Sequence, residues 1–415
     1  MSSQQMLLQQ ARIKKIPDGW KLNTVGSSCR IRNDLRKPIS VEEREKIQGP
    51  YPYYGPTGIL DYINEFLVDG CFALIGEDGD HFLKYAEKDQ TLLVEGKFNV
   101  NNHAHIIEST GACSADWFHH YFKHRNIRSF LSRQGAGRYK LNKDTLQKLP
   151  ILLPPVSEQR NITALLSTWD FAIEKNERLI AAKERRYWWL SKKYLFGDAD
   201  QSSNTTKKTK WFTVPDHWQV VKIGKIAKDV SKFNGSGENS PVLSCTKYDG
   251  LVDSLTYFDK QVFSLDTSTY KVVSRGQFAY ATNHIEEGSI GYQDVYDKGL
   301  VSPMYTVFET NRDVDDIYLY KVLKSVVYLH IFRANTSSSV DRRGSLRWKE
   351  FSKLPIPLPP IEEQKHIAAI LTAARQEIDL LKKQAEAYRR QKRGLMQKLL
   401  TGEWRVKIDE EADNG

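Results

Sequence analysis

The sequence is poor in the residues and patterns that mark secreted and membrane-spanning proteins. Only four of its 415 residues are cysteine, at positions 29, 71, 113 and 245, and no two lie close together. This spacing argues against a disulfide framework or a cysteine-based zinc site and suits a reducing cytosol. No stretch approaches the roughly 18 consecutive apolar residues that a membrane helix needs. The glutamine-rich residues 1–16 also lack the apolar segment of a secretory signal.

Catalytic signatures are scarce as well. The sequence has no Gly-x-x-x-x-Gly-Lys-Ser/Thr loop for ATP and no His-Glu-x-x-His metal motif. Phe233-Asn-Gly-Ser-Gly237 resembles a methyltransferase loop, but it follows no clear apolar strand, and no Asn/Asp-Pro-Pro-Tyr/Phe motif comes after it. Asp80, Glu95 and Lys97 match a nuclease core, although three such common residues match by chance. The sequence therefore predicts a chain without a catalytic site.

Five histidines raise the question of a bound metal ion. His119, His120 and His124 fall on a predicted helix, and His103 and His105 form a His-x-His pair. Neither group comes with carboxylates in the pattern of a catalytic metal site. We therefore expect these histidines to be exposed or packed, and we expect no metal and no cofactor on this chain.

What the sequence has in excess is basic and aromatic residues. Lysine and arginine total 61 against 51 acidic residues, which gives a formal net charge of +10, and there are 9 Trp, 20 Tyr and 17 Phe. A basic, aromatic-rich protein favours a nucleic-acid partner. The composition is otherwise that of a globular protein, with length for about two to four domains.

The chain also repeats itself. Ile16-Pro-Asp-Gly-Trp20 recurs as Val214-Pro-Asp-His-Trp218, and Leu149-Pro-Ile-Leu-Leu-Pro-Pro155 recurs as Leu354-Pro-Ile-Pro-Leu-Pro-Pro360. The offset is 198 residues at the first pair and 205 at the second. Such self-similarity indicates two copies of one unit of about 200 residues. Between the shared ends, the two middles cannot be aligned.

Each copy ends in the pattern of a long helix, over residues 157–197 and 362–402. Apolar residues recur at alternating steps of three and four, which is the seam of a coiled coil. Prolines just before each segment and Gly197 and Gly402 at its end fit the helix boundaries. At 1.5 Å per residue each helix is about 60 Å long. Two separate amphipathic helices, each packed on its own domain, are the alternative, but the seam is long for that.

Connectivity predicts how the helices pair. The polar linker 198–210 spans at most about 45 Å, so the second copy begins near the far end of the first helix. The second helix must then run back antiparallel to the first. We expect an α+β fold with two pseudo-symmetric globular domains separated by the helices. The predicted segments are an N-terminal arm 1–15, domain 16–156, helix 157–197, linker 198–213, domain 214–361, helix 362–402 and an acidic tail 403–415.

The repeated ends carry a specific combination of motifs. Pro17-Asp-Gly-Trp20 and Pro215-Asp-His-Trp218, the two Leu-Pro-rich segments and the helix starts at Glu158-Gln159 and Glu363-Gln364 occur in the same order in both copies. In these motifs, over residues 16–402, the chain resembles the specificity subunit of a type I restriction–modification enzyme. The segments 70–79 and 101–105 also look like one common type of target-recognition domain.

The resemblance implies a non-catalytic subunit with two target-recognition domains, each reading one half of a split DNA site. The helices would act as a ruler and a docking platform for two DNA adenine methyltransferase subunits, and the complex would recruit ATP-dependent restriction subunits. S-adenosylmethionine, ATP and Mg would belong to those partners, in the cytoplasm of a bacterium or archaeon. Since the two middles differ, we expect the two half-sites to differ. A purely structural coiled-coil adaptor remains an alternative, disfavoured by the charge and the differing domains.

Candidate DNA contacts in the first domain lie in four segments. Residues 51–58 form an aromatic loop that could meet sugars or bases, and 76–79 predict a hairpin tip whose carboxylates suit cytosine N4. The amides at 101–102 suit adenine, and 133–139 combine arginines with small residues. A structural turn is the alternative for the first three segments. The candidates are Tyr53, Tyr54, Thr57, Asp78, Asn101, Asn102, His103, Arg133, Gln134, Arg138 and Tyr139.

The second domain holds a matching arginine-rich segment, 333–344, at the 205-residue offset from the fourth of these segments. It combines a Ser/Thr/Asn run with flanking arginines, and its occurrence in both copies strengthens both predictions. The candidates here are Asn283, His284, Ser302, Arg333, Asn335, Thr336, Ser337, Arg342 and Arg343. On the helices, we expect Trp169, Tyr187, Tyr388 and Leu395 to dock partner subunits.

The missing catalytic motifs generate a first prediction. The purified chain, incubated with DNA and S-adenosylmethionine, should transfer no methyl group and should cut no DNA. Radiolabelled methyl transfer and gel analysis of the DNA measure both activities, with an assembled methyltransferase as the positive control. Methyl transfer by the chain alone would contradict the prediction.

Overall fold

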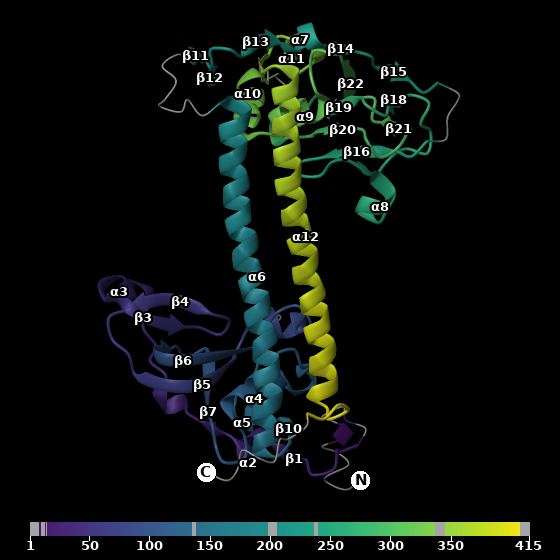
Figure 1. Cartoon of the computed structure of the whole chain (residues 1–415). Helices are drawn as coiled ribbons and strands as arrows, with labels where there is room; N and C mark the ends of the chain where they lie inside the picture. Colours follow the sequence, from purple (N-terminus) through teal and green to yellow (C-terminus); the bar gives the residue numbers. More distant parts are fainter. Residues whose placement is uncertain are drawn as a thin grey trace. The chain divides into compact units, whose positions relative to one another are not determined.

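The computed structural model (Figure 1) describes residues 8–9, 13, 15–134, 138–197, 206–235, 240–336 and 345–406. At Arg133, Gln134 and Arg138 only the backbone is described. The chain divides into two compact units. Unit 1 comprises residues 1–177 and 383–415, and unit 2 comprises residues 178–382. Each unit is described by itself below.

Two long helices each contribute one half to either unit. Helix α6, Val156–Phe196, has 41 residues, and helix α12, Ile361–Leu399, has 39. Both begin directly after a Pro-Pro pair, because proline fits the start of a helix but not its interior. After α6 the backbone turns at Gly197, whose φ of 61° lies in the left-handed region that favours glycine. The sequence placed both helices to within a few residues.

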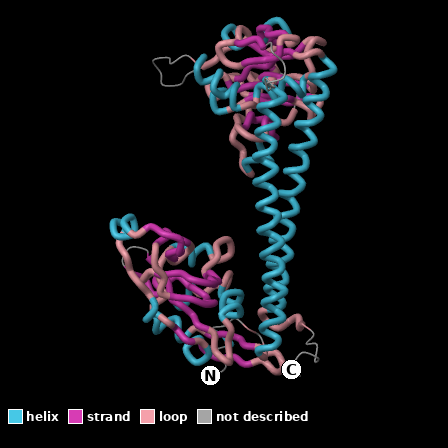
Figure 2. The backbone as a smooth tube through the Cα atoms, turned by 60° about the vertical axis from the view of Figure 1, so that its left-hand side comes forward, coloured by secondary structure: helices cyan, strands magenta, loops and turns pink. Residues whose placement is uncertain are grey.

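The helix segments run antiparallel in both units (Figures 1 and 2). In unit 1 the ring of Trp169 lies 5.7 Å from the ring of Tyr388. In unit 2 ion pairs join Lys183 to Glu377 and Glu184 to Lys382. The pairing follows the predicted seam, in which Ile173, Ile180 and Leu381 are half-buried and other apolar members are fully buried, namely Ile162, Leu166, Ile367, Leu371, Ile378 and Leu399.

Unit 1 is built on a six-stranded sheet in the order β2-β7-β5-β6-β3-β4. One face of its central strand, with Ala73 and Ile75, packs against Trp117 and Phe118 of helix α4, and the other face forms a second core around Phe72 and Phe98. The elements are β1 Lys21–Thr24, α2 Val25–Ser28, β2 Arg30–Ile31, η1 Asn33–Leu35, α3 Val41–Lys46, β3 Gln48–Tyr54, β4 Ile59–Ile63, β5 Val68–Gly76, η2 Asp80–Lys84, β6 Thr91–Val100, β7 Ala104–Glu108, α4 Ala115–Phe122, η3 Arg128–Phe130, β8 Ser132–Gln134, β9 Arg138–Lys140, α5 Lys143–Lys148 and β10 Pro150–Leu153.

Unit 2 has a different middle. A four-stranded sheet, β14-β22-β19-β20, packs Phe278, Tyr280 and Phe308 into the main core, and a three-stranded sheet, β15-β18-β21, lies beside it. The elements are β11 Thr206–Lys208, β12 Thr213–Pro215, β13 Gln219–Lys222, α7 Ile223–Ile226, β14 Ala227–Asp229, β15 Lys232–Phe233, β16 Leu243–Thr246, β17 Gly250–Asp253, α8 Ser254–Phe258, β18 Lys271–Ser274, β19 Phe278–Ala281, η4 Ile285–Glu287, β20 Ile290–Tyr292, β21 Lys298–Val301, β22 Tyr305–Thr310, α9 Asp316–Leu323, α10 Val326–Asn335, α11 Trp348–Phe351 and β23 Pro355–Leu358.

The repeated motifs form the same joint in both units. The Leu-Pro segments become strands β10 and β23, which pair antiparallel with β1 and β13 directly after the Pro-Asp-x-Trp motifs. The indole Nε1 of Trp20 donates to Glu158 Oε2 at 3.0 Å, and that of Trp218 donates to Glu363 Oε1 at 3.1 Å. The motifs therefore fasten the start of each long helix to its globular part.

The second residue of the Glu-Gln motif completes this joint. In unit 1, Gln159 accepts from the backbone N–H of Ser114, the N-cap of α4, and donates to the carbonyls of Ala112 and Pro154. In unit 2, Gln364 accepts from the N–H of Asp315, the N-cap of α9, and donates in the same way. Both glutamines are fully buried. An amide supplies the donor and the acceptor that this position needs.

Glu158 provides a test of the joint. Its side chain is fully buried and also accepts two bonds from Arg405, at 2.6 and 2.9 Å, whereas Glu363 is about one third exposed. Glu158→Ala should lower the free energy of unfolding by about 1–3 kcal/mol, because it leaves the Trp20 indole unpaired in the core.

The matched control is Glu363→Ala, which should cost less, since water can reach the position. Denaturant unfolding of both variants measures the difference. Equal losses in the two variants would show that burial of Glu158 adds nothing to the joint.

Candidate nucleic-acid interface

Three separate segments predicted to contact DNA come together in unit 1. The backbone N–H of Glu77 donates to His103 O at 2.7 Å, and its carbonyl accepts from Leu141 N at 2.7 Å. Gly79 N donates to Tyr139 O at 3.3 Å. The side chains of His103 and Asp78 meet at 3.0 Å between Nδ1 and Oδ2. The ends of β5, β7 and the β8–β9 hairpin therefore form one cluster of polar groups.

One expectation about this region is wrong. Residues 76–79 do not form a tight hairpin tip, because Gly79 leads into the 3₁₀ helix η2 and strand β6 begins only at Thr91. Gly79 has a φ of 134°, which glycine adopts readily. The backbone of Asp78 thereby forms a β-bridge with Lys140 of β9 instead of lying at the end of a free turn.

The carboxylate of Glu77 stabilises this cluster through ion pairs. Its carboxylate bonds Arg36 Nη1 at 2.6 Å and Lys140 Nζ at 3.2 Å, and His105 Nε2 lies 3.9 Å away. Burial by itself raises the pKa of Glu77, but the hydrogen bonds from Arg36 and Lys140 outweigh it and leave the pKa below its usual value. The carboxylate thus joins Arg36, which follows η1, to Lys140 of strand β9 through charged contacts.

The predicted site residues in this unit divide into buried and exposed groups. Tyr53 is 1% exposed, and its hydroxyl donates to Lys37 O and accepts from Ile39 N. Asn101 is buried and accepts from His103 N in an Asx turn, the structural alternative that its sequence left open. Both residues serve the scaffold. Thr57, Asn102 and His103 are exposed, and Tyr54, Asp78 and Tyr139 are half-buried.

A cavity of about 370 Å³ lies beside the exposed residues Asn102 and His103. Arg44 also lines it, with its guanidinium bonded to Asp61 and placed 5.1 Å from the centre of the Tyr53 ring. No sequence pattern pointed to Arg44, because it lies in helix α3, far along the chain from Asn102 and His103.

The arginine-rich segment of unit 1 forms the β8–β9 hairpin. Its register pairs Arg133 with Tyr139 and Gln134 with Arg138. The side chains of these two arginines and of Gln134 lie outside the described part of the structure, as do residues 135–137. Their contact with DNA stays a prediction.

In unit 2, Asn283, His284 and Ser302 line one cavity of about 520 Å³. The N–H of Leu346 donates to Thr282 O at 2.8 Å, so the chain re-enters the described structure next to this cavity after residue 344. Arg333 and Asn335 are exposed near the end of α10, and Thr336 is half-buried. Ser337, Arg342 and Arg343 lie outside the described residues.

Lys324 is a residue of this region that the sequence did not reveal. Its amine donates to Lys247 O at 2.6 Å and to Gly288 O at 2.9 Å, so it joins the β16–β17 turn to the turn after η4. Burial lowers its pKa to about 8. The lysine therefore holds two walls of unit 2 in place through backbone carbonyls.

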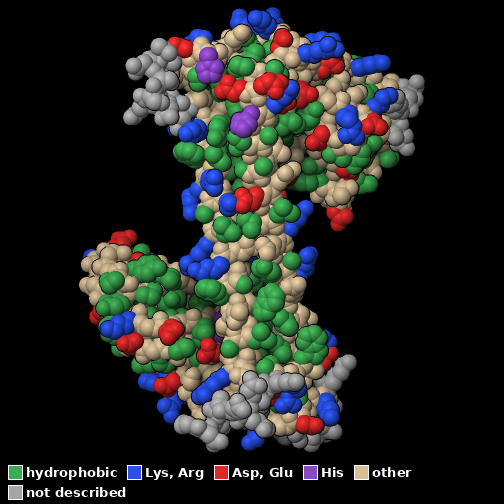
Figure 3. Space-filling model, in the orientation of Figure 1, with side chains coloured by type: hydrophobic (Ala, Val, Ile, Leu, Met, Phe, Trp, Pro, Cys, Tyr) green, Lys and Arg blue, Asp and Glu red, His purple; other side chains and the backbone are tan. Residues whose placement is uncertain are grey.

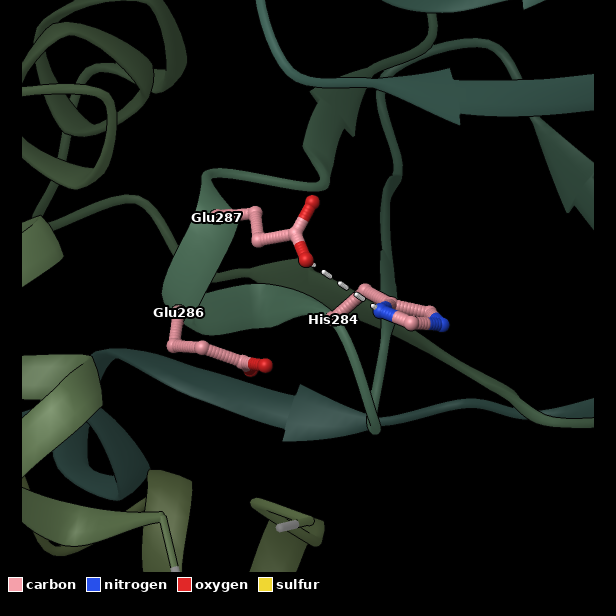
Figure 4. A group of neighbouring side chains, drawn as sticks. All are labelled: His284, Glu286 and Glu287. Atoms are coloured by element: carbon pink, nitrogen blue, oxygen red, sulfur yellow. Dashed lines mark ion pairs between the residues drawn. The ribbon is translucent and has the colours of Figure 1, made fainter. Parts of the chain in front are cut away.

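His284, Glu286 and Glu287 form a group that could hold a metal ion, with ligand atoms within 4.8 Å of one another. Figure 4 shows an ion pair between His284 and Glu287, with the side chain of Glu286 beside them. His284 Nδ1 and Glu287 Oε1 are 3.7 Å apart, and both side chains are more than half exposed. An open group of this kind does not by itself indicate a metal, and the absence of a metal stays a prediction.

Comparisons with known proteins decide the family. The model of the type I restriction–modification DNA specificity domain matches the chain twice, over residues 17–184 and 215–387. The chain belongs to this family. A putative type I restriction enzyme specificity subunit of Haemophilus influenzae is 26% identical over 346 residues, covering 82% of this chain and 84% of that protein. The MjaVIII specificity subunit of Methanocaldococcus jannaschii is 23% identical over 412 residues, covering 95% of both.

A solved structure shares the fold of this family member. The crystal structure of the type I restriction–modification S subunit from M. genitalium aligns with a TM-score of 0.60 at 14% identity, covering 93% of this chain and 96% of that one. The predicted α+β fold with two target-recognition domains and long helices is confirmed. Specificity subunits are the non-catalytic DNA-recognition components of their systems, so the predicted lack of enzymatic activity is confirmed too.

The four helix residues predicted to dock partners contribute to internal packing of this specificity subunit. Trp169 packs against Tyr388 in the seam, Tyr187 packs on the unit 2 core, and Leu395 packs on the unit 1 core. The apolar side chains that the helices leave exposed are Leu165, Phe171, Leu179, Trp188, Trp189 and Leu380. Sequence reasoning missed them because it followed the seam, and these residues lie outside it.

The positive charge of the surface is spread out. On the face drawn in Figure 3, lysine and arginine side chains are distributed over both units rather than gathered in one stripe. Within the described ranges, every helix is too short or too polar to cross a lipid bilayer.

Glu77 gives a test of the unit 1 cluster. Because its pKa is lowered in the folded protein, it stabilises the fold at pH values above its unfolded pKa of about 4.3, and this contribution disappears as the pH falls through the folded pKa. Glu77→Gln should therefore lower the melting temperature at pH 7, and the gap to the parent should close toward pH 3.

Glu65→Gln serves as the control, since Glu65 is about half exposed on the turn after β4. It should change the melting temperature little at any pH. A gap between parent and Glu77→Gln that stays constant across this range would contradict the anchoring role of the Glu77 charge.

Proposed function

We propose that this specificity subunit reads a bipartite, asymmetric DNA site, with one half-site for each globular domain. The domains are residues 16–156 and 214–361, and the helices between them carry no base-reading role. The observation that supports this proposal is the joint described above. Identical motifs attach two middles of different sheet topology to the same pair of helices. Different middles present different side chains, so the two half-sites differ in sequence.

The proposed DNA contacts are the polar and aromatic residues that the sequence predicts in each domain. In the first domain these are Tyr54, Thr57, Asp78, Asn102, His103, Arg133, Gln134, Arg138 and Tyr139. In the second they are Asn283, His284, Ser302, Arg333, Asn335, Thr336, Ser337, Arg342 and Arg343. Tyr53 and Asn101 are left out, because their polar groups are used inside the protein. Arginine and asparagine suit guanine and adenine edges, and the hydroxyls suit phosphates.

The same complex would contain two DNA adenine methyltransferase subunits docked on the long helices. The exposed aromatic residues Phe171, Trp188 and Trp189 support this, because large apolar side chains on the outside of a helix pair mark a protein contact. Restriction subunits would join through the methyltransferases. S-adenosylmethionine, ATP and Mg would be held by those partners, and the assembly would work in the cytoplasm.

The arginines of the two matched segments provide the test of DNA reading. We expect at least one of Arg138→Ala, Arg342→Ala and Arg343→Ala to relax the preference at a single base pair, at a cost of about 1–3 kcal/mol. The loss should be confined to the half-site of the domain that carries the change. A lost phosphate contact would instead weaken all sequences alike and reduce the salt slope by about 1.

The measurement is the affinity of each variant, assembled with its methyltransferase, for a panel of single-base changes in both half-sites. Arg30→Ala is the control, since Arg30 is 69% exposed and pairs with Glu108 at the end of β2, away from both arginine segments in the chain. If all three variants bind every sequence as the parent does, these segments do not read DNA.

A further inference from the structure

Each unit carries an apolar surface that its own fold leaves uncovered. The unit 1 apolar surface consists of residues on β4 and the turn after it, and the unit 2 apolar surface consists of residues on α8 and the segment that follows. Their side chains are 39–51% and 40–89% exposed, respectively. The members are Ile59, Leu60, Tyr62, Phe66 and Leu67 in unit 1, and Leu255, Tyr257, Phe258, Val262 and Leu265 in unit 2.

This exposure is concentrated rather than scattered. Five large apolar side chains are exposed within residues 59–67 and five within 255–265. Single exposed apolar residues are normal on a protein surface, but clusters mark contact sites. Strand β4 is also the edge of its sheet, and an exposed apolar edge strand invites a partner. Figure 3 shows hydrophobic side chains gathered over the β3–β4 end of unit 1.

The sequence segments that carry the two surfaces are acidic, although the chain as a whole has a net charge of +10. Residues 59–69 contain three acids, Asp61, Glu65 and Asp69, and no lysine or arginine. Residues 249–266 contain four aspartates and a single lysine. In unit 1, basic side chains offset the acids, because Arg44 and Lys37 pair with Asp61 and Glu65, and Lys97 Nζ lies 4.6 Å from the centre of the Phe66 ring. Within the described residues, none of the four aspartates of unit 2 forms an ion pair. The unit 2 surroundings therefore repel DNA phosphates and attract cationic side chains.

The unit 2 apolar surface is an ordered piece of structure. Asp253 caps α8 by accepting from Thr256 N at 2.9 Å, and Asp259, with a φ of 51°, ends the helix. The Tyr257 hydroxyl donates to Asp249 Oδ2 at 3.2 Å. A preformed surface binds a partner without the entropic cost of ordering it first.

We propose that each apolar surface binds a protein partner whose own surface combines apolar side chains with lysine or arginine. Resting on the function proposed above, this partner is the methyltransferase subunit, one copy on each unit. The acidic surroundings of the unit 2 apolar surface favour a protein over DNA, and the apolar exposure of both surfaces matches the core of a protein interface. An exposed apolar surface occurs in both middles although they share no alignable sequence. This indicates that both units need such a surface for the same kind of partner.

This contact would place the partner next to the candidate DNA site. Val262 of the unit 2 apolar surface lines the same cavity as Asn283, His284 and Ser302. A methyltransferase held there touches the wall of the cavity that reads DNA. It is thus positioned to receive the DNA that the domain selects.

The experiment uses the full-length chain and the methyltransferase subunit that purifies with it from its host. One variant combines Leu255→Ser with Leu265→Ser, and a second combines Leu60→Ser with Leu67→Ser. A third, Asp259→Asn with Asp266→Asn, removes charge and leaves the apolar side chains in place. Val326→Ser is the control, because Val326 is 62% exposed on α10 and has no acidic residue near it in the chain. Titration calorimetry gives the affinity and the number of methyltransferase copies bound.

We expect each apolar double variant to lose about tenfold or more in affinity for one of two methyltransferase copies, as removal of anchor residues does. The charge variant should weaken binding at low salt more than at high salt, and Val326→Ser should bind as the parent does. Unchanged methyltransferase affinity in both apolar variants would overturn the proposal.

Two further outcomes identify a different occupant and equally overturn it. Loss of DNA affinity by the chain alone, with methyltransferase binding intact, would assign the surfaces to DNA. Self-association of the parent that the apolar variants abolish would assign them to a second copy of this chain. If the parent bound no methyltransferase at all, the proposed function would fail first, and that result is distinct from a surface-specific loss.

Discussion

The structure depends on the fastening of each long helix to its globular part by an adjacent Glu-Gln pair whose glutamine is fully buried. Glu158 and Gln159, like Glu363 and Gln364, stand at the start of a helix, where four backbone N–H groups lack intrahelical partners and the helix dipole favours negative charge. The glutamate reaches outward to a tryptophan, and the glutamine reaches to the cap of another helix. Three elements are thus locked by two adjacent side chains.

This joint explains why the two middles are free to differ. Each middle begins after β1 or β13 and ends before β10 or β23, and those strand pairs close it off from the helix. Trp117 and Tyr318 extend the parallel, since each donates to a carbonyl of the closing strand at 2.9–3.0 Å although the residue types differ. A six-stranded sheet in one unit and two smaller sheets in the other are therefore compatible with the same attachment.

The sequence predicted structure well where the signal is a periodic or local pattern of residues. The seam, the Pro-Pro pairs and the terminal glycines placed α6 and α12 almost to the residue, because each signal restricts the backbone directly. Burial was harder to predict. Tyr53 and Asn101 have the side chains of DNA-binding residues, but long-range folding encloses one and uses the other in a turn. Arg44 and Lys324 act through contacts with residues distant in the sequence, and no local sequence pattern predicts such contacts.

The helix residues also show what a sequence pattern predicts and what it leaves out. A heptad reports which side chains face the partner helix, so it directed attention to Trp169 and Tyr388, whose rings meet each other. Trp188 and Trp189 fall outside the seam and stay about half exposed, with ring contacts only to Tyr187 and Lys193 of the same helix among the contacts described. The same helix therefore carries residues that pack inside the protein and residues that stay exposed. The exposed apolar residues indicate where partners bind, because internal packing does not require them to be apolar.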